Sequence, residues 1–270
     1  MVELQTRYQC KSPFTDTFWS NWRINLRRFR AEGHYLAQRW GRSPEAQDLA
    51  AATYTELVDD WKLMFALQED GLFGCHTYRV RGDLQVSRDL LDSILEITFL
   101  RRCLAVQRGD RLRVLDIGAG YGRFAHRFLT AFPAAFVANV DGVAISTFLC
   151  EFYLNYRGLG QRCSVVPIDE IEELPRGCDL AVNIHSWSEC TRETVKYWVR
   201  ILCDIGVRVL FVVPHDEELT TMEPGGLKDT FLPEIFAGGF RLRHKVQKFN
   251  KSTIMCSDGL QPAWYFLFER

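Results

Sequence analysis

The sequence predicts an α/β fold, in which a mostly parallel sheet is covered by helices and preceded by a helical extension. From Arg111 onward, short runs rich in Val, Ile and Leu alternate with helix-length segments, which is typical of βαβ units. Before Arg111, apolar residues recur at the spacing of a helix face. Examples of that spacing are Leu49, Tyr54, Leu57, Trp61 and Met64. We therefore expect a helical extension over residues 1–86 and a sheet-based core over residues 87–270.

The composition is that of an ordinary globular protein. Of the 270 residues, 47% are hydrophobic and 25% are charged, and the formal net charge is -1. A balanced charge without a basic run disfavours nucleic acid as a partner. The nine cysteines contain no Cys-x-x-Cys pair, which indicates reduced thiols. Because the chain shows neither a signal-peptide pattern nor an apolar run near the roughly 20 residues that cross a bilayer, we expect a cytoplasmic protein without a membrane partner.

The extension is predicted to be helical up to a loop that contains glycines and aromatic residues. A first helix face is indicated by Phe18, Trp22, Leu26 and Phe29. The loop covers residues 71–83 and carries His76 and Tyr78. Ser87 then supplies a suitable N-cap for a helix over residues 88–104, which leads into the core.

Short apolar runs in the core predict parallel strands that are buried on both faces. These runs are 113–117, 136–140, 163–167, 180–184 and 207–213. Helices are predicted over residues 144–156 and 232–237. Two final segments, 240–249 and 264–268, suit an antiparallel pair of strands.

The sharpest local pattern joins the first of these strands to a helix through a turn that contains three glycines. Gly118 and Gly120 allow the backbone to approach a ligand, and the helix that follows presents its N-terminal amides. A dinucleotide fingerprint would have glycine where this chain has Arg123, so the spacing disfavours a dinucleotide. Asp116 precedes the turn, and Asp141 ends the next strand, where a carboxylate can accept two ribose hydroxyls or, alternatively, cap the following helix.

This pattern resembles the first motif of class I methyltransferases that use S-adenosylmethionine. The resemblance implies a Rossmann-like, seven-stranded sheet, in which the turn wraps the methionine portion of the cofactor and Asp116 orients its amino group. It also implies an adenine-side role for Asp169. The cofactor-binding residues expected on this basis are Asp116, Gly118, Gly120, Tyr121, Asp141, Gly142, Asp169 and Asn183.

A second resemblance concerns residues 179–190, which are similar to the signature of a family of sugar O-methyltransferases from bacterial natural-product pathways. That signature runs approximately N-I-H-S-aromatic-S-E-M, and this chain departs from it with Cys190 where Met is common. Residues 87–91 also resemble the lead-in of that family, and this resemblance implies a hydroxyl and a guanidinium near the cofactor carboxylate. The Asn/Asp-Pro-Pro-aromatic motif of many N-methyltransferases is missing after the fourth strand. The resemblance therefore implies O-methylation of a sugar or glycosylated small molecule.

Methyl transfer to an alcohol needs a base that removes the hydroxyl proton, and a histidine suits that task. His185 lies just past the end of the fourth predicted strand, although it could instead satisfy backbone groups there. Glu189, four residues on, would share a helix face with His185 and could orient it or act as the base. His215 follows the fifth strand and is a third catalytic candidate.

The acceptor is expected to meet an aromatic wall and polar side chains. His76, Tyr78 and Trp187 are candidates for the wall, and Asp216 for binding hydroxyls. The extension would act as a lid, no metal is expected, and a homodimer is possible. Two alternatives stay open, namely an O- or N-methyltransferase for a non-sugar natural product or peptide, and a non-catalytic scaffold that binds the cofactor.

Overall fold

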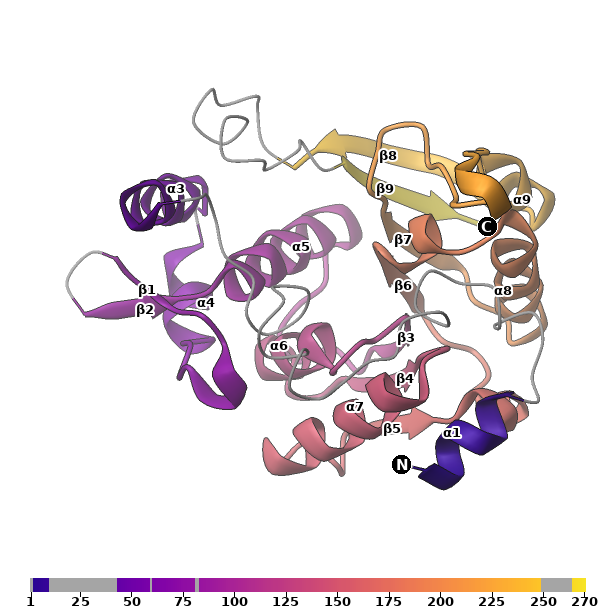
Figure 1. Cartoon of the computed structure of the whole chain (residues 1–270), viewed down its shortest axis with the longest axis horizontal. Helices are drawn as coiled ribbons and strands as arrows, with labels where there is room; N and C mark the ends of the chain where they lie inside the picture. The colour runs from indigo at the N-terminus through magenta and orange to yellow at the C-terminus, as the bar shows by residue number, and fades with distance from the viewer. Residues whose placement is uncertain (1, 10–42, 59, 81–82, 249–263) are drawn as a thin grey trace.

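The sheet and its helices are seen in a computed structural model, which describes residues 2–9, 43–58, 60–80, 83–248 and 264–270 (Figure 1). Its main sheet has seven strands in the order β5-β4-β3-β6-β7-β9-β8. Their bounds are β3 (Arg113–Ile117), β4 (Phe136–Val140), β5 (Cys163–Val166), β6 (Leu180–Ile184), β7 (Val209–Val213), β8 (Arg241–Gln247) and β9 (Trp264–Glu269). The helical pattern predicted around residues 18–29 lies outside the described residues.

Five strands run parallel, and the last two form the reversed pair that the sequence predicts. β3 pairs in parallel with β4 and β6, whereas β9 is antiparallel to both β7 and β8. β5 ends at Val166, one residue before the predicted end at Pro167, because proline has no N–H to donate to a sheet. β7 begins later than predicted because the Val207 N–H bonds to the carbonyl of Leu202 at the end of a helix, 2.9 Å away. The α/β fold is therefore confirmed.

Helices cover both faces of the sheet (Figure 1). Successive strand residues point to opposite faces, so Val114 joins one hydrophobic cluster and Leu115 the other. One face packs against α5 (Arg88–Leu104), α6 (Arg123–Ala131) and α7 (Ala144–Tyr156). The opposite face packs against α8 (Arg192–Asp204) and α9 (Leu232–Ala237). The predicted bounds of α5, α7 and α9 are confirmed.

The described residues of the extension between 43 and 86 form a small unit on the side of α5 and α6. Its elements are α3 (Pro44–Leu57), α4 (Trp61–Ala66) and a hairpin of β1 (Tyr78–Val80) and β2 (Leu84–Val86) that the sequence did not predict. Tyr54 and Met64 belong to the same hydrophobic cluster as α5 and α6. Extension and core therefore share one hydrophobic core, and the division at residue 86 stays a prediction.

The first helix, α1 (Val2–Gln9), lies apart from α3 and α4 (Figure 1). It packs against α7 and the short 3₁₀ helix η3 (Ile168–Glu173) at the β5 side of the sheet. The hydroxyl of Tyr8 accepts the Ile168 N–H at 3.0 Å and shares a hydrogen bond with Thr147. The two described parts of the extension thus contact different regions of the core.

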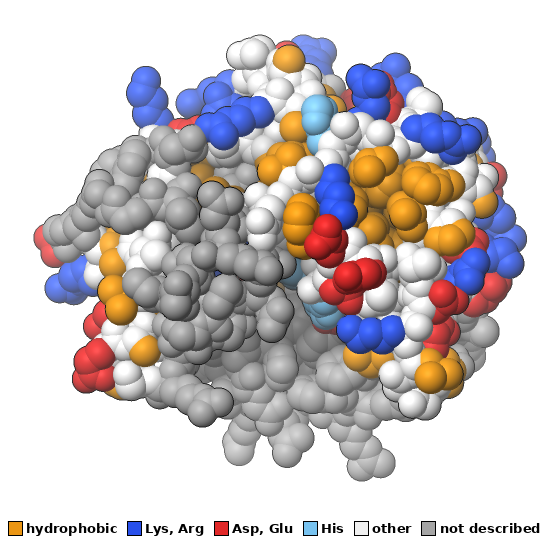
Figure 2. Space-filling model, turned by 90° about the horizontal axis from the view of Figure 1, so that it is seen from above, with side chains coloured by type: hydrophobic (Ala, Val, Ile, Leu, Met, Phe, Trp, Pro, Cys, Tyr) orange, Lys and Arg blue, Asp and Glu red, His pale blue; other side chains and the backbone are white. Residues whose placement is uncertain are grey.

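The opposite edge of the sheet is β8, which Figure 2 views from above. Hydrophobic side chains lie among charged ones on this side, and Leu242 and Val246 of β8 are exposed. Basic residues alternate with them along the strand, as is common on edge strands that must not pair with other chains. Across the described residues, no helix is long and apolar enough to span a membrane.

Candidate active site

A cavity of about 400 Å³ lies beyond the carboxyl ends of β3, β4, β6 and β7. Its volume is within the range of small-molecule sites. Its lining includes the glycine turn after β3, the first residues after β4, the segment after β6 and His215 after β7. The carboxyl ends of the strands are where an open α/β sheet binds its ligands. The predicted position of the site is therefore also where the structure has a cavity.

The glycine turn wraps one side of this cavity with its backbone. Gly118, Gly120 and Gly122 all have positive φ, at 76°, 59° and 87°, a conformation that favours glycine. The N–H groups of Gly118 and Ala119 both donate to the carbonyl of Val140, at 2.8 and 3.2 Å. The turn then enters α6 at Arg123, so the first amides of that helix lie next to the cavity.

Gly118 is needed for a further reason that the sequence did not show. A Cβ on Gly118 would lie 2.1 Å from the Oγ of Ser186, in the segment after β6. Asn183 holds that segment in place, because its Nδ2 donates to Ser186 Oγ and to the Ile117 carbonyl, while its Oδ1 accepts the Trp187 N–H. Asn183 is not part of the cavity lining. Its observed contacts position neighbouring residues.

Asp116 brings an unsatisfied carboxylate to the cavity. It is 3% exposed, and its Oδ2 has no hydrogen-bond partner among the described residues. Burial raises the pKa of Asp116 to about 7, although Arg123 acts to lower it, and the nearby Asp141 adds to the effect of burial. A cationic group of a ligand would pair with this carboxylate and favour its ionised form.

Asp141 lies at the end of β4 and serves the protein's own backbone. Its Oδ2 accepts the Gly120 N–H and its Oδ1 accepts the Val143 N–H, both at 2.8 Å. Burial raises the pKa of Asp141 to about 6. Each carboxylate oxygen has a second lone pair, so these contacts leave room for two ligand hydroxyls. Gly142 also lines the cavity.

His185 occupies a strained position between β6 and the 3₁₀ helix η4 (Ser186–Glu189). Its φ is 69° and its ψ is -35°, an unfavourable region for a residue with a Cβ. The His185 N–H donates to the Val213 carbonyl at 2.8 Å, which ties the turn to β7. Its Nδ1 has no hydrogen-bond partner within the described chain. Burial, with a smaller effect from His215, lowers the pKa of His185 well below its usual value, so the ring is neutral.

The structure pairs Glu189 with His215. The distance from His215 Nε2 to Glu189 Oε1 is 3.5 Å, and the rings of His185 and His215 have centroids 5.2 Å apart. Burial lowers the pKa of His215 as well. All three predicted catalytic residues line the cavity. An orienting contact from Glu189 to His185 stays a prediction.

Two other predicted site residues are engaged elsewhere. Asp169 is not in the cavity lining and forms an ion pair with Arg7 of α1. Asp216 is also outside the lining, accepts the Thr220 N–H at 2.9 Å and pairs with Lys228. It therefore shapes the loop after β7 in this structure.

The expected aromatic wall is not assembled around the cavity by the described residues. The rings of His76 and Tyr78 contact each other, with centroids 4.8 Å apart, and neither residue lines the cavity. Trp187 does line it but is 1% exposed and packs edge-on against Phe231. Its Nε1 has no partner in the part of the chain that the structure describes. The Trp187 side chain is therefore buried in the core, whereas an aromatic wall for an acceptor needs an exposed ring.

The first two turns of α5 supply lining residues whose importance the sequence only partly signalled. Arg88, Asp89 and Asp92 all face the cavity. Although burial acts to raise it, the pKa of Asp92 is held well below its usual range by Lys248 and Arg88. The i, i+4 spacing of Arg88 and Asp92 behind the Ser87 cap could have indicated that they share a face. Among the described residues, no group of three or more His, Cys, Asp or Glu side chains is arranged to hold a metal ion.

Comparisons with known proteins support the fold. No protein-family profile and no curated protein matches this chain. The solved structure of the cyclase SpnF is 13% identical, covers 85% of this chain and 98% of its own, and has a TM-score of 0.52. A candidate sarcosine dimethylglycine methyltransferase from Galdieria sulphuraria is 12% identical, with 82% and 98% of the two chains covered and a TM-score of 0.50.

A third solved structure is the magnesium protoporphyrin IX methyltransferase ChlM from Synechocystis PCC 6803, with S-adenosylmethionine bound. It is 12% identical and covers 84% of this chain and 100% of its own, with a TM-score of 0.48. Identities this low establish only the fold. The two structures with TM-scores of 0.52 and 0.50, together with the strand order, show that the chain has the Rossmann-like fold of class I methyltransferases.

Proposed function

We propose that this chain is an S-adenosylmethionine-dependent O-methyltransferase that acts on a hydroxyl of a sugar or glycosylated small molecule. The observation that carries this proposal is the buried Asp116 carboxylate, whose Oδ2 has no partner among the described residues and which lies beside the glycine turn. A buried carboxylate without a partner is unfavourable unless a ligand supplies one. The ammonium group of the methionine portion of S-adenosylmethionine fits that need.

The other residues at this end of the cavity fit the same cofactor. Asp141 has free lone pairs for the two ribose hydroxyls, while its bonds to Gly120 and Val143 keep it oriented. Arg88 lines the cavity and can pair with the cofactor carboxylate. A cation site, a diol site and an anion site thus lie along one cavity, which supports a zwitterionic nucleoside as its ligand.

The acceptor end supplies the base. When bound, S-adenosylmethionine offers a methyl group that its sulfonium makes electrophilic. An acceptor hydroxyl must lose its proton as its oxygen takes that methyl group, and the neutral ring of His185 can accept this proton. His215 lies next to His185, and Glu189 lies next to His215, so the Glu189 carboxylate favours positive charge that develops on the pair of imidazoles.

Polar groups at the acceptor end favour a hydroxylated substrate. Asp92 lines the cavity one helical turn after Arg88, with 3.9 Å between Arg88 Nε and Asp92 Oδ2, and its carboxylate can accept a hydrogen bond from a substrate hydroxyl. Together with the similarity of residues 179–190 to sugar O-methyltransferases, this supports a sugar as acceptor. A non-sugar natural product or peptide is one alternative acceptor. A non-catalytic scaffold that binds the cofactor is the other alternative, because one fold serves many functions.

Two experiments test the proposal in sequence. Titration calorimetry with S-adenosylhomocysteine should show binding, whereas NAD should show none. The protein is then incubated with deuteriomethyl-labelled S-adenosylmethionine and a panel of glycosides with their matched aglycones, and products are identified by mass spectrometry. Label on the sugar of a glycoside supports the proposal. Label on aglycones alone favours the non-sugar alternative, and binding without any product favours the scaffold.

A further inference from the structure

The glycine turn has few conformational constraints of its own. Three of its residues are glycines with positive φ, and such residues sample many backbone states when nothing holds them. A turn that must be ordered when the ligand binds lowers the affinity, whereas a turn that is already ordered does not. The side chains that hold the turn should therefore influence cofactor affinity even where they do not touch the cofactor.

Side chains of α5 hold the two non-glycine residues that follow Gly120 in this segment. The hydroxyl of Tyr121 donates to Asp89 Oδ2 at 2.6 Å. Arg123 donates from Nη1 to Ser93 Oγ at 2.7 Å, and its guanidinium forms an ion pair with Glu96 at 3.0 Å. Asp89, Ser93 and Glu96 are spaced so that they share one face of α5.

This contact between α5 and the turn is buried. The Glu96 side chain is 1% exposed, and the Arg123 side chain is 16% exposed. Ser93 and Glu96 do not line the cavity. Ser93 and Glu96 therefore do not touch a ligand in the cavity, and their hydrogen bonds and ion pair with Arg123 lead to the turn. The charge of Glu96 also acts on Asp116, whereas Ser93 carries no charge, so Ser93 tests the contact with the turn by itself.

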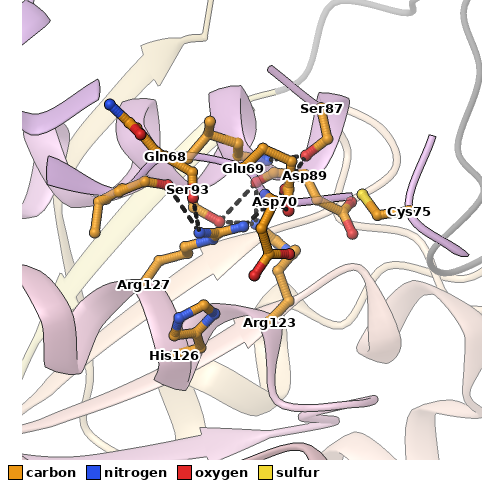
Figure 3. Close-up of polar contacts among 12 residues, drawn as sticks. Gln68, Glu69, Asp70, Cys75, Ser87, Asp89, Ser93, Arg123, His126 and Arg127 are labelled. Carbon is orange, nitrogen blue, oxygen red and sulfur yellow. Dashed lines mark hydrogen bonds and ion pairs between the residues drawn. The ribbon is translucent and has the colours of Figure 1, made fainter. Parts of the chain in front are cut away.

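A second contact fixes the start of α5 itself (Figure 3). Ser87 caps α5 by accepting the Leu90 N–H at 3.0 Å, and it donates to Glu69 Oε2 at 2.7 Å. Glu69 belongs to the extension and pairs at 2.7 Å with Arg127, one turn after Arg123 on α6. Figure 3 shows both arginines pointing from α6 toward these acidic and hydroxyl groups.

We infer that Ser93 and Glu96 are positioning residues for the glycine turn, and that Glu69 supports them by anchoring the start of α5. The extension thereby acts on the cofactor site from outside the cavity. This inference rests on the proposed function for the identity of the ligand, S-adenosylmethionine, but not for the ordering of the turn.

The test uses the full chain and two readouts. Calorimetry with S-adenosylhomocysteine gives the dissociation constant, and amide hydrogen exchange without ligand gives the protection of residues 118–122. We expect Ser93→Ala to weaken binding by roughly 3- to 10-fold and Glu96→Gln by roughly 10- to 100-fold, with faster exchange in the turn. Glu69→Gln should weaken binding by about 2- to 5-fold, since it acts through one more contact.

Thr98→Val is the matched control. Thr98 is also a buried residue of α5, and its hydroxyl has no hydrogen-bond partner among the described residues. This variant should leave both the dissociation constant and the exchange of the turn unchanged. Should Glu96→Gln fail to fold, Ser93→Ala carries the test alone.

The possible outcomes separate this inference from the proposed function. If Ser93→Ala and Glu96→Gln lower the melting temperature but leave both readouts unchanged, the contacts are merely structural and the inference is wrong. If the wild-type protein does not bind S-adenosylhomocysteine, the proposed function is wrong, and the exchange rates alone decide whether α5 orders the turn.

Discussion

The two ends of the cavity are built in different ways. At the cofactor end, the groups that would face the ligand come from two consecutive strand ends, and their positions follow from main-chain bonds such as those from Gly118 and Ala119 to Val140. At the acceptor end, side chains from three separate segments meet, including Asp92, His185 and His215. The cofactor end is thus set by local backbone geometry, and the acceptor end by packing between distant segments.

The comparison predicts that changes at the acceptor end affect turnover and leave cofactor binding intact. His185→Gly should lower the methyl transfer rate by about 10²–10⁴-fold, the usual contribution of a general base. Added imidazole should restore part of the rate. The dissociation constant of S-adenosylhomocysteine should change less than about twofold, since only the base is removed. Near-normal turnover of His185→Gly would show that the base is Glu189 or His215 instead of His185.

The same variant tests the strain at His185. Glycine accepts the observed φ of 69° more easily than a residue with a Cβ, so His185→Gly should be more stable than His185→Ala, which keeps the strain. We expect a difference of about 1 kcal/mol in the free energy of unfolding, measured with urea. Equal stabilities would show that the backbone relaxes at this position.

Changes at the cofactor end should have the opposite effect. Asp141→Ala should weaken S-adenosylhomocysteine binding by about 1.5–3 kcal/mol, because bonds to a charged carboxylate are lost both to the ligand and to the Gly120 N–H. Calorimetry measures this loss. Asp141→Asn keeps an acceptor and serves as the milder control. Unchanged affinity would limit Asp141 to capping the turn and the next helix.

Gly118→Ala tests whether the two ends depend on each other. The new Cβ would meet Ser186 Oγ, and the φ of 76° is unfavourable for alanine, so we expect a loss of about 1–3 kcal/mol in stability. Adding Ser186→Gly should restore part of it by removing the clash. Gly109→Ala is the matched control, because a Cβ there meets nothing within 4 Å. Thermal unfolding of the wild-type protein, the two single variants and the double variant measures these differences in stability.

Asp116 should make the stability of the protein depend on pH. Because its folded pKa of about 7 is above the unfolded value, the folded state holds a proton between pH 4 and 7 that the unfolded state does not. The free energy of unfolding therefore falls as pH rises through this range. Asp116→Asn should remove this effect and increase stability at pH 8 by about 1–3 kcal/mol, with little change at pH 4.

Ligand binding should have the opposite pH dependence in the wild-type protein. A cationic ligand group prefers the ionised Asp116, so affinity for S-adenosylhomocysteine should weaken as pH falls below 7. In Asp116→Asn, the remaining dependence should centre near pH 6, where Asp141 takes up its proton. A wild-type dissociation constant that is independent of pH between 5.5 and 8 would exclude Asp116 as the partner of the ammonium group.

The sequence by itself determined the sheet, the helices and the turn. Strands buried on both faces require continuous apolar runs, and the Ser87 cap marks the start of α5, so most of their bounds could be predicted from local patterns. The end of β5 and the start of β7 were not predicted. The glycine turn was equally predictable, because its backbone conformation depends on residues that are adjacent in sequence. The β1–β2 hairpin was not, since its strands are only three residues long.

Only the tertiary structure decided which side chains meet. The kink at His185 and the 3₁₀ geometry of η4 place Glu189 beside His215, although spacing alone suggested His185. Docking of α1 gives Asp169 a partner in Arg7, and α5 brings Arg88 to the cavity across a large gap in sequence. The physical reason is that periodicity records whether a residue faces the core, whereas contacts between loops depend on how whole elements pack against one another.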